Sequence, residues 1–382
     1  MEAYTNGNLN EYNGHVGQKK FGKEGIVFYK PTLSKRDIKS VMEAMVQDEI
    51  SSGSVVLNYE KEFASTFGFR HALSALSWTA AYHLAFMSVG IGQGDEVILS
   101  SVAPVAVLDA INQTQAEPIV IDIAKESFHP SRDLIFDKIS EKTKAIVFQY
   151  PYGSYFNYDD IRVEIQELNR KRDHKIRIIE DISYNVGTEV DGLYIGSQAD
   201  IAIAGLHEDM LMTIGKGAMV LTNSRNIFGT AKDLRMHASG SPYRLRYDYT
   251  ITDYQAAMGL EQLGQLSIVS ERRKKIGDKY MESIKSVSAI STFFKSHEFD
   301  AFGAFPLIFQ KPQDYIERYF HSLQIETRRT TPLGTLHEML GFPGSEFPNA
   351  QKLYDRGILL PLYPNLTKMN IERIISSLRG FY

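Results

Sequence analysis

The sequence predicts an α/β protein in which helices cover both faces of a mostly parallel β-sheet, followed by a smaller α+β domain. Between Gly90 and Ile179, short runs rich in Val and Ile alternate regularly with helical stretches. This alternation is typical of parallel sheets, because two parallel strands need a crossover connection, usually a helix. A chain of 382 residues is also long enough to form about two domains.

Composition narrows the class of protein. The chain is 43% hydrophobic and 23% charged, which is ordinary for a globular protein. Its net charge of −4 and the lack of a basic block argue against nucleic-acid binding. We find no apolar run long enough for a membrane span and no signal-peptide pattern, and we expect no membrane association. The absence of cysteine excludes disulfides and cysteine–zinc sites and fits a cytoplasmic protein.

The N-terminal part begins with residues 1–24, which are rich in Asn, Gly and Lys and predict a loose arm that could rest on a partner subunit. Ser34–Val46 predicts an N-capped amphipathic helix. One face of it carries Ile38, Val41, Met42 and Met45. A second helix is expected over Tyr59–Phe67, with Phe63 and Phe67 turned inward.

The expected sheet has seven strands. They are Ala72–Leu76, Glu96–Leu99, Pro118–Ile121, Ala145–Gln149, Ile176–Ile179, Ile201–Ala204 and Met219–Leu221. The expected helices between them are Ala80–Val89, Pro104–Asn112, Asp133–Ser140 and Tyr158–Arg172. Ser77, Trp78 and Thr79 open the first of these helices, and backbone N–H groups at such a start can hold a phosphate, although most strand–helix junctions bind nothing.

After Asn223 the pattern becomes helical through Arg235, and a polar loop follows over His237–Tyr249. A long helix over residues 251–284 is expected to bridge two domains. The remaining short elements are the strand Ala304–Phe309 and the helices Gln313–Ser322 and Met369–Leu378. The predicted division is an arm (1–24), a large domain (25–262) and a small domain (263–382).

The stretch Asp200–Asn223 is where we expect a functional site. It reads as a strand, a polar elbow over Gly205–Asp209, a glycine-framed turn and a second strand. This arrangement places side chains at the edge of a sheet, where the active sites of α/β enzymes usually lie. Glu180 and Asp181 end a nearby strand with two carboxylates, which could serve a ligand or simply be solvated.

Several sequence motifs then occur in an order and with a spacing that are typical of one protein family. They are the segments Leu76–Ser101, Ile178–Gly187, Gly196–His207, Tyr247–Leu263 and Leu360–Thr367. Through them the chain resembles the DegT/DnrJ/StrS group of pyridoxal-phosphate-dependent sugar aminotransferases over residues 25–380. The resemblance implies the fold-type-I aminotransferase architecture, a homodimer with each site built from two chains, pyridoxal or pyridoxamine phosphate as cofactor, and a nucleotide sugar as substrate.

The positions that match the cofactor site of this family depart from its pattern. The resemblance places the Schiff-base lysine at Met210, and a thioether can neither form an imine nor shuttle a proton. Asp181 matches the carboxylate that partners the pyridinium nitrogen, and His207 lies beside the site. The other matching positions are Trp78 and Thr79 (the phosphate cradle), Pro104 (the stacking aromatic), Tyr184 (a glutamine), Gly205 (the phosphate-binding serine) and Asp248 (an asparagine reached from the partner subunit).

Several of these residues have two readings. His207, Glu208 and Asp209 could divide acid–base roles or form a solvated elbow, and three consecutive residues cannot converge on a metal, so we expect no metal site. Lys216 could be a displaced lysine, but the following strand should carry it away. Trp78 is a bulky residue where the family keeps glycine, and we hypothesise that it fills the volume of the pyridine ring.

Four arginines could contact a nucleotide-sugar diphosphate or be ordinary surface charges. They are Arg244, Arg246, Arg328 and Arg329.

The first functional hypothesis is a degenerate sugar aminotransferase homologue in nucleotide-sugar or polysaccharide metabolism. It would hold no covalent cofactor, and would bind a nucleotide sugar or form a heterodimer with an active paralogue. The second is an active enzyme with altered chemistry that recruits His207, since the family has a dehydratase branch with histidine in place of the lysine. The third is a conventional transaminase.

Overall fold

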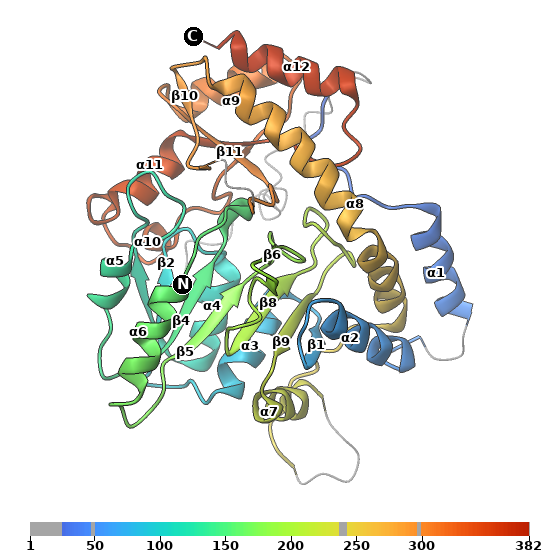
Figure 1. Ribbon diagram of the computed structural model, residues 1–382, viewed down its shortest axis with the longest axis vertical. Helices are drawn as coiled ribbons and strands as arrows, with labels where there is room; N and C mark the ends of the chain where they lie inside the picture. The colour runs from blue at the N-terminus through green and yellow to red at the C-terminus, as the bar shows by residue number, and fades with distance from the viewer. Residues whose placement is uncertain (1–24, 47–49, 237–242, 296–298, 382) are drawn as a thin grey trace, which may run out of the picture.

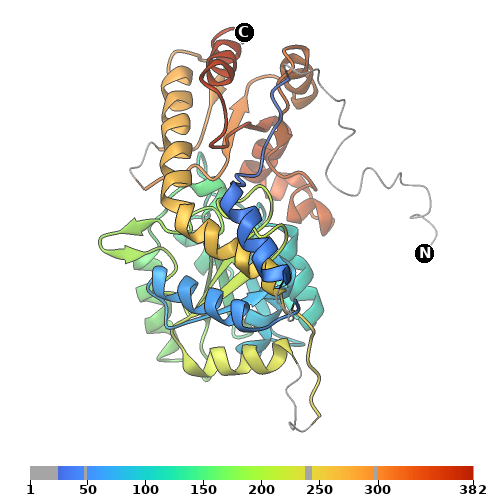
Figure 2. The same cartoon turned by 90° about the vertical axis from the view of Figure 1, so that its right-hand side faces the viewer.

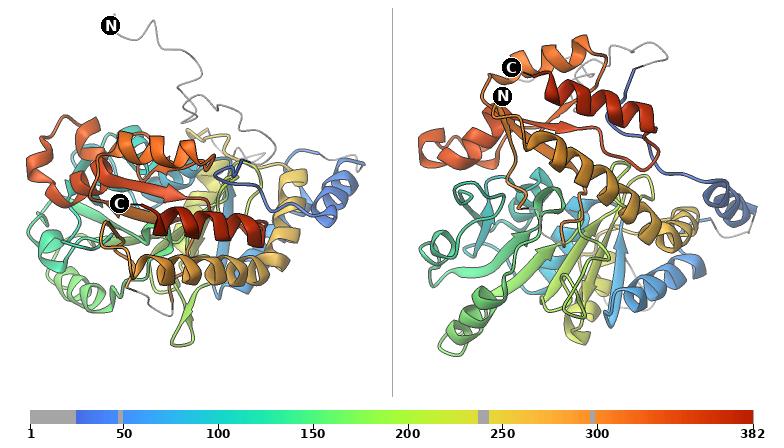
Figure 3. Two further views of the ribbon diagram at one scale, coloured as in Figure 1. Left: turned by 90° about the horizontal axis from the view of Figure 1, so that it is seen from above. Right: turned by 45° about the horizontal axis from the view of Figure 1, so that its top comes forward.

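The computed structural model describes residues 25–46, 50–236, 243–295 and 299–381 (Figure 1). The predicted arm over residues 1–24 and the start of the polar loop at residues 237–242 lie outside these ranges. The chain forms a large sheet flanked by helices and a second, smaller sheet with its own helices above it (Figures 1 and 3). None of the described helices has the length and apolarity needed to span a membrane.

The large sheet has seven strands and confirms the predicted α/β class. In spatial order they are β1 (His71–Ala75), β9 (Ala218–Thr222), β8 (Ile201–Gly205), β5 (Arg177–Asp181), β4 (Thr143–Gln149), β2 (Glu96–Ser100) and β3 (Glu117–Ile121). From β8 to β3 all neighbours run parallel. β9 runs antiparallel to both β1 and β8, because it returns from the elbow in the opposite direction.

Helices cover both faces of this sheet. One core contains side chains of α3 (Trp78–Ser88), α4 (Val105–Thr114) and α7 (Arg225–Arg235). The other contains side chains of α2 (Ser54–Thr66), α5 (Arg132–Phe136) and α6 (Asp159–Asn169). Successive strand residues alternate between the two cores, as the two-residue period of a strand requires: Val147 lies in the first core and Ile146 in the second. As predicted, Phe63 and Phe67 are buried.

Helix α1 (Lys35–Val46) forms where expected, but its apolar stripe faces outward. In this chain Ile38, Met42 and Met45 are 57%, 61% and 59% exposed. The opposite side of the helix packs on the bridging helix, where buried Asp37 accepts a hydrogen bond from Gln262 at 2.6 Å. An exposed apolar stripe on a surface helix is typical of a face that another surface covers.

The C-terminal part of the chain, called the small domain below, contains an antiparallel sheet in the order β10 (Ile290–Ser291), β11 (Phe305–Phe309), β13 (Gly357–Leu360) and β12 (Arg328–Arg329). Its helices are α9 (Gln313–Ser322), α10 (Leu336–Met339), α11 (Pro348–Arg356) and α12 (Lys368–Arg379), with a 3₁₀ turn at Gly344–Glu346. The remaining short elements are a 3₁₀ turn at Pro151–Gly153 and the hairpin β6 (Glu189–Val190) and β7 (Leu193–Tyr194), which projects from the body in Figure 2.

Helix α8 (Asp253–Ile284) is the expected bridge between the sheets. It packs against α1 and α2 at one end and α12 at the other, and Figure 2 shows it along most of the molecule's height. The exact domain division at residue 262 stays a prediction. Ile26, at the start of the described chain, pairs with Ile325 of the small domain.

Buried polar contacts hold the small domain against the large sheet. Asp122, just after β3, accepts hydrogen bonds from the backbone N–H groups of Asn349 and Ala350 at 3.1 and 2.8 Å. These donors lie in the first turn of α11, so the carboxylate caps a helix of the other domain. A second contact joins Ser101 Oγ and His337 Nδ1 at 2.5 Å.

We therefore expect Asp122→Ala to lower the free energy of unfolding by about 1–3 kcal/mol, because it leaves buried donors of α11 without an acceptor. Urea unfolding followed by circular dichroism measures this change. Asp137→Ala is the matched control, since Asp137 is exposed. Equal stability of the two variants would contradict the proposed role of the cap.

Candidate functional site

Three elements meet at one edge of the large sheet. Asp181 is the last residue of β5, Gly205 is the last residue of β8, and Trp78 is the first residue of α3. Because β5 and β8 are parallel, their carboxyl ends open on the same edge, which is where ligands bind in α/β sheets. Ser77 caps α3, its Oγ accepting a hydrogen bond from Ala80 N at 3.1 Å, and so fixes the place where Trp78 leaves the backbone.

Asp181 is buried and held by the protein itself. Tyr82 Oη donates to its Oδ2 at 2.5 Å, and the backbone N–H of Ser183 donates to its Oδ1 at 2.9 Å. Burial raises the pKa of Asp181 above its ordinary value, although hydrogen bonds from Ser183 and Tyr82 act in the opposite direction. Both carboxylate oxygens therefore already have donors.

The Trp78 indole lies directly on the backbone at Gly205. A Cβ atom at Gly205 would stand 3.2 Å from Trp78 Cε2 and 3.3 Å from Trp78 Cδ2. The same Cβ would lie 3.1 Å from Ser183 Oγ, which accepts the Gly205 N–H at 2.7 Å. The absence of a side chain at Gly205 thus provides the space that the indole uses.

The polar edge of the indole points into the protein. Trp78 Nε1 is buried, and the described residues offer it no acceptor in hydrogen-bond geometry. It nevertheless lies near enough to Asp181 to favour the charged form of that carboxyl group. The Trp78 and His207 ring centroids are 5.6 Å apart, and the rings are tilted by 47°. Burial lowers the pKa of His207 below its ordinary value, so this imidazole is neutral at pH 7.

The three residues of the elbow diverge. Glu208 Oε1 accepts a hydrogen bond from Tyr29 Oη at 3.2 Å, and Asp209 pairs with Arg328 at 3.5 Å. The Arg328 guanidinium in turn lies over the rings of Phe28 and Tyr29, at 4.5 and 4.9 Å from their centroids. This geometry favours a structural elbow tied to the small domain over an acid–base trio.

Met210 directly follows the elbow and is buried, with 7% of its surface exposed. Its carbonyl oxygen lies 3.5 Å from Nη2 of Arg273, whose Nη1 donates to Gly303 O at 2.6 Å. Arg273 is buried, and burial lowers its pKa to about 10. Lys216 lies exposed beyond the turn at Gly215, in line with the expectation that it is carried away.

The other predicted positions lie around this cluster or apart from it. Thr79 follows Trp78 in the first turn of α3, and Pro104 immediately precedes α4. Tyr184 packs against Gly303 and lines a small hollow with Asp209 and Arg273. Asp248 is exposed on the loop before α8 and accepts a hydrogen bond from Thr250 Oγ1 at 3.3 Å.

The arginines considered for phosphate binding already have carboxylate partners. Arg244 and Arg246 both pair with Asp233, at 3.1 and 2.8 Å. Arg329 pairs with Glu317 at 3.0 Å. In the described ranges, no group of three or more acidic or histidine side chains is placed to hold a metal ion.

The sequence reasoning missed three residues of the site. Tyr82 lies four positions after Trp78 in the same helix, a spacing that puts both side chains on one face. Ser183 follows Asp181 by two residues and links it to Gly205. Arg273 carried no local signal, because it comes from α8 and reaches the elbow only through the fold.

Known proteins resemble this chain over most of its length. The profile of the DegT/DnrJ/EryC1/StrS aminotransferase family matches residues 31–379. GDP-perosamine synthase of Escherichia coli O157:H7 is 30% identical, over 94% of this chain and 98% of that protein. The spore coat polysaccharide biosynthesis protein SpsC of Bacillus subtilis is 26% identical, over 91% and 95%. A putative sugar aminotransferase of Streptococcus pneumoniae in its PLP form superposes with a TM-score of 0.86 at 22% identity, over 93% and 98% of the two chains.

The contact of Trp78 with Gly205 predicts a coupled pair. Gly205→Ala should lower the free energy of unfolding by about 1–3 kcal/mol, because the new methyl group crowds the indole and Ser183. The same substitution should cost less in a Trp78→Ala background, and urea unfolding of the four proteins gives the coupling. Gly229→Ala is the control, since a Cβ there meets open space. Equal costs in both backgrounds would show that the indole does not press on Gly205.

Proposed function

The chain belongs to the DegT/DnrJ/EryC1/StrS aminotransferase family, and we propose that it is a member that cannot carry out transamination alone. The observation that carries this proposal is Met210, the residue at which the family resemblance places the Schiff-base lysine. It is buried at the end of the elbow, and its thioether cannot form an imine. Lys216, the nearest lysine along the chain, is exposed.

The environment of Met210 supports the same proposal. The cofactor that the family implies would need the edge between Asp181 and Gly205 to be open. There the Trp78 indole lies against the Gly205 backbone, and the Asp181 oxygens accept hydrogen bonds from Tyr82 and Ser183. These residues do not fit pyridoxal or pyridoxamine phosphate well, and we propose that neither is held stably.

We further propose that the protein binds a nucleotide sugar as a dimer. Support for the ligand comes from the GDP-perosamine synthase of Escherichia coli, with which the chain shares 30% identity over nearly the full length of both. Support for the dimer is the outward apolar stripe of α1, which a second chain would cover. The second chain is either another copy or an active paralogue whose site this protein completes.

A second candidate function is a cofactor-dependent enzyme with altered chemistry. The observation in its favour is His207, a neutral imidazole beside the candidate site that could accept a proton. It requires that pyridoxamine phosphate bind without a covalent link.

The test is the visible absorption spectrum of the protein after incubation with pyridoxal phosphate, recorded before and after borohydride. We expect no retained chromophore and no reduced adduct in the wild-type protein. Met210→Lys alone should gain little, because Trp78 still covers Gly205, whereas Met210→Lys combined with Trp78→Gly and Gly205→Ser should gain a reducible adduct. A lysine-linked adduct in the wild-type protein would overturn the proposal, and retained pyridoxamine phosphate would favour the second candidate.

The ligand is tested separately by calorimetric titration with GDP-mannose and related nucleotide sugars. We expect saturable binding with a dissociation constant in the range of about 1 μM to 1 mM, the usual range for substrates of enzymes. If no nucleotide sugar gives a heat of binding, the proposed ligand is wrong, and only the role of a subunit in a larger assembly remains. Sedimentation of this protein mixed with the paralogue would then test that role.

A further inference from the structure

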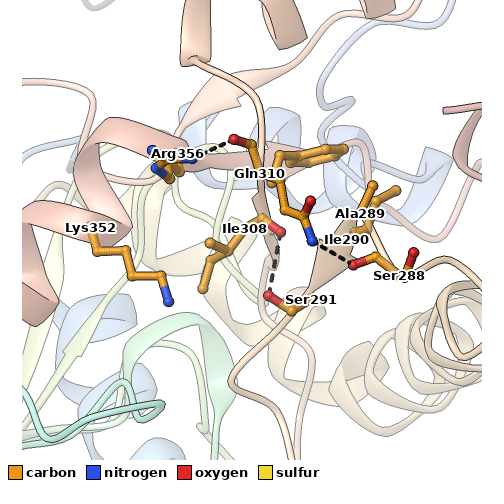
Figure 4. Close-up of a pocket in the computed structure, with 9 residues that line it drawn as sticks. Ser288, Ala289, Ile290, Ser291, Ile308, Gln310, Lys352 and Arg356 are labelled. Atoms are coloured by element: carbon orange, nitrogen blue, oxygen red, sulfur yellow. Dashed lines mark hydrogen bonds between the residues drawn. The ribbon is translucent and has the colours of Figure 1, made fainter. Parts of the chain in front are cut away.

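A hollow in the small domain shares no residue with the candidate site at the edge of the large sheet. It lies between β10, β11 and α11 and has a volume of about 230 Å³ (Figure 4). We propose that this hollow binds the phosphate group of a small organic phosphate or of free phosphate. This inference does not depend on the proposed function.

Its charge is the first argument. Lys352 and Arg356 are four residues apart on α11 and both line the hollow, whereas none of the described residues that line it is acidic. Two like charges at this spacing repel each other, and an anion between them would remove the repulsion.

The unused hydrogen-bonding capacity is the second argument. Figure 4 shows the Lys352 side chain extending beside the hollow, and within the described residues its ammonium has no hydrogen-bond or ion-pair partner. The Arg356 guanidinium donates through Nη1 to the carbonyl of Gln310, and this anchors it while leaving its other N–H groups for a ligand. A cation in the last turn also suits the negative end of α11, but this explains Arg356 and not Lys352.

The other residues that line the hollow suit a small organic group attached to the phosphate. Ser288 and Ser291 supply hydroxyl groups on one side, and Ile308 supplies apolar surface between them and the cations. Ser291 Oγ donates to Ile308 O at 3.4 Å, and Gln310 Nε2 donates to Ser288 O at 3.0 Å, so the wall is held in place. The volume is below the roughly 300 Å³ of pockets for drug-sized ligands, which favours a compact ligand.

Binding should stabilise the folded protein. The first turn of α11 is capped by Asp122 of the large domain, and its last turn carries Arg356, so the helix joins the hollow to the domain interface. A ligand that binds only the folded state raises the free energy of unfolding by an amount that grows with the logarithm of the ligand concentration once that concentration exceeds the dissociation constant. Thermal unfolding therefore reports occupancy without any assay of activity.

The experiment is thermal unfolding of the full chain in a zwitterionic buffer with inorganic phosphate, glucose 1-phosphate, or potassium chloride at matched ionic strength. We expect the midpoint to rise with the logarithm of the concentration of at least one phosphate and not to rise with chloride. Lys352→Met and Arg356→Met should each weaken the apparent affinity by roughly tenfold or more. Lys61→Met, which removes an exposed lysine from α2, should leave the response unchanged.

Tighter binding of glucose 1-phosphate than of inorganic phosphate would assign an organic phosphate, and the reverse would assign free phosphate. The proposal is overturned if neither ligand shifts the midpoint beyond chloride. It is also overturned if the Lys61→Met variant loses the response as much as the Lys352→Met variant, since this would indicate only general screening of surface charge. A ³¹P resonance titration of the wild-type protein and both pocket variants separates lost binding from altered folding.

Discussion

The contact between the Trp78 indole and the Gly205 backbone is the constraint on which the candidate site depends. The indole packs closely at position 205, where a Cβ would stand 3.2 Å from the ring and would require the ring to give way by a few tenths of an ångström. The same indole has its Nε1 near Asp181 and lies with its ring centroid 5.6 Å from that of His207. One close packing contact thus organises the ends of two strands and the start of a helix.

The scaffold around this contact does not depend on the chemistry of the site. The seven-stranded sheet is held by two cores on its faces, and the small domain is held by the Asp122 cap and by the bridging helix α8. Side chains at the edge of such a sheet can change while the cores remain, because the fold and the site depend on different residues. This explains how a chain can keep the family architecture while its candidate site has Met210 and Trp78.

The large-scale architecture was predictable from the sequence because each element has a local signal. Strands such as Ile201–Ala204 are short buried runs, and the capped start of α3 follows from Ser77. The outward face of α1 was not predictable, since an apolar stripe looks the same whether it faces a core or a partner. The packing of Trp78 on Gly205 and the reach of Arg273 into the elbow involve residues far apart in sequence, and only the fold brings them together.

The most direct measurement uses the fact that Trp78 is the single tryptophan of the chain. Its fluorescence reports on this site alone, and a pyridine cofactor bound within a few ångströms of the indole would quench it. If the indole closes the site, titration with pyridoxal phosphate and with pyridoxamine phosphate will give only the weak, non-saturating decrease shown by free tryptophan in solution. Saturable quenching at micromolar concentrations of either compound would contradict a closed site.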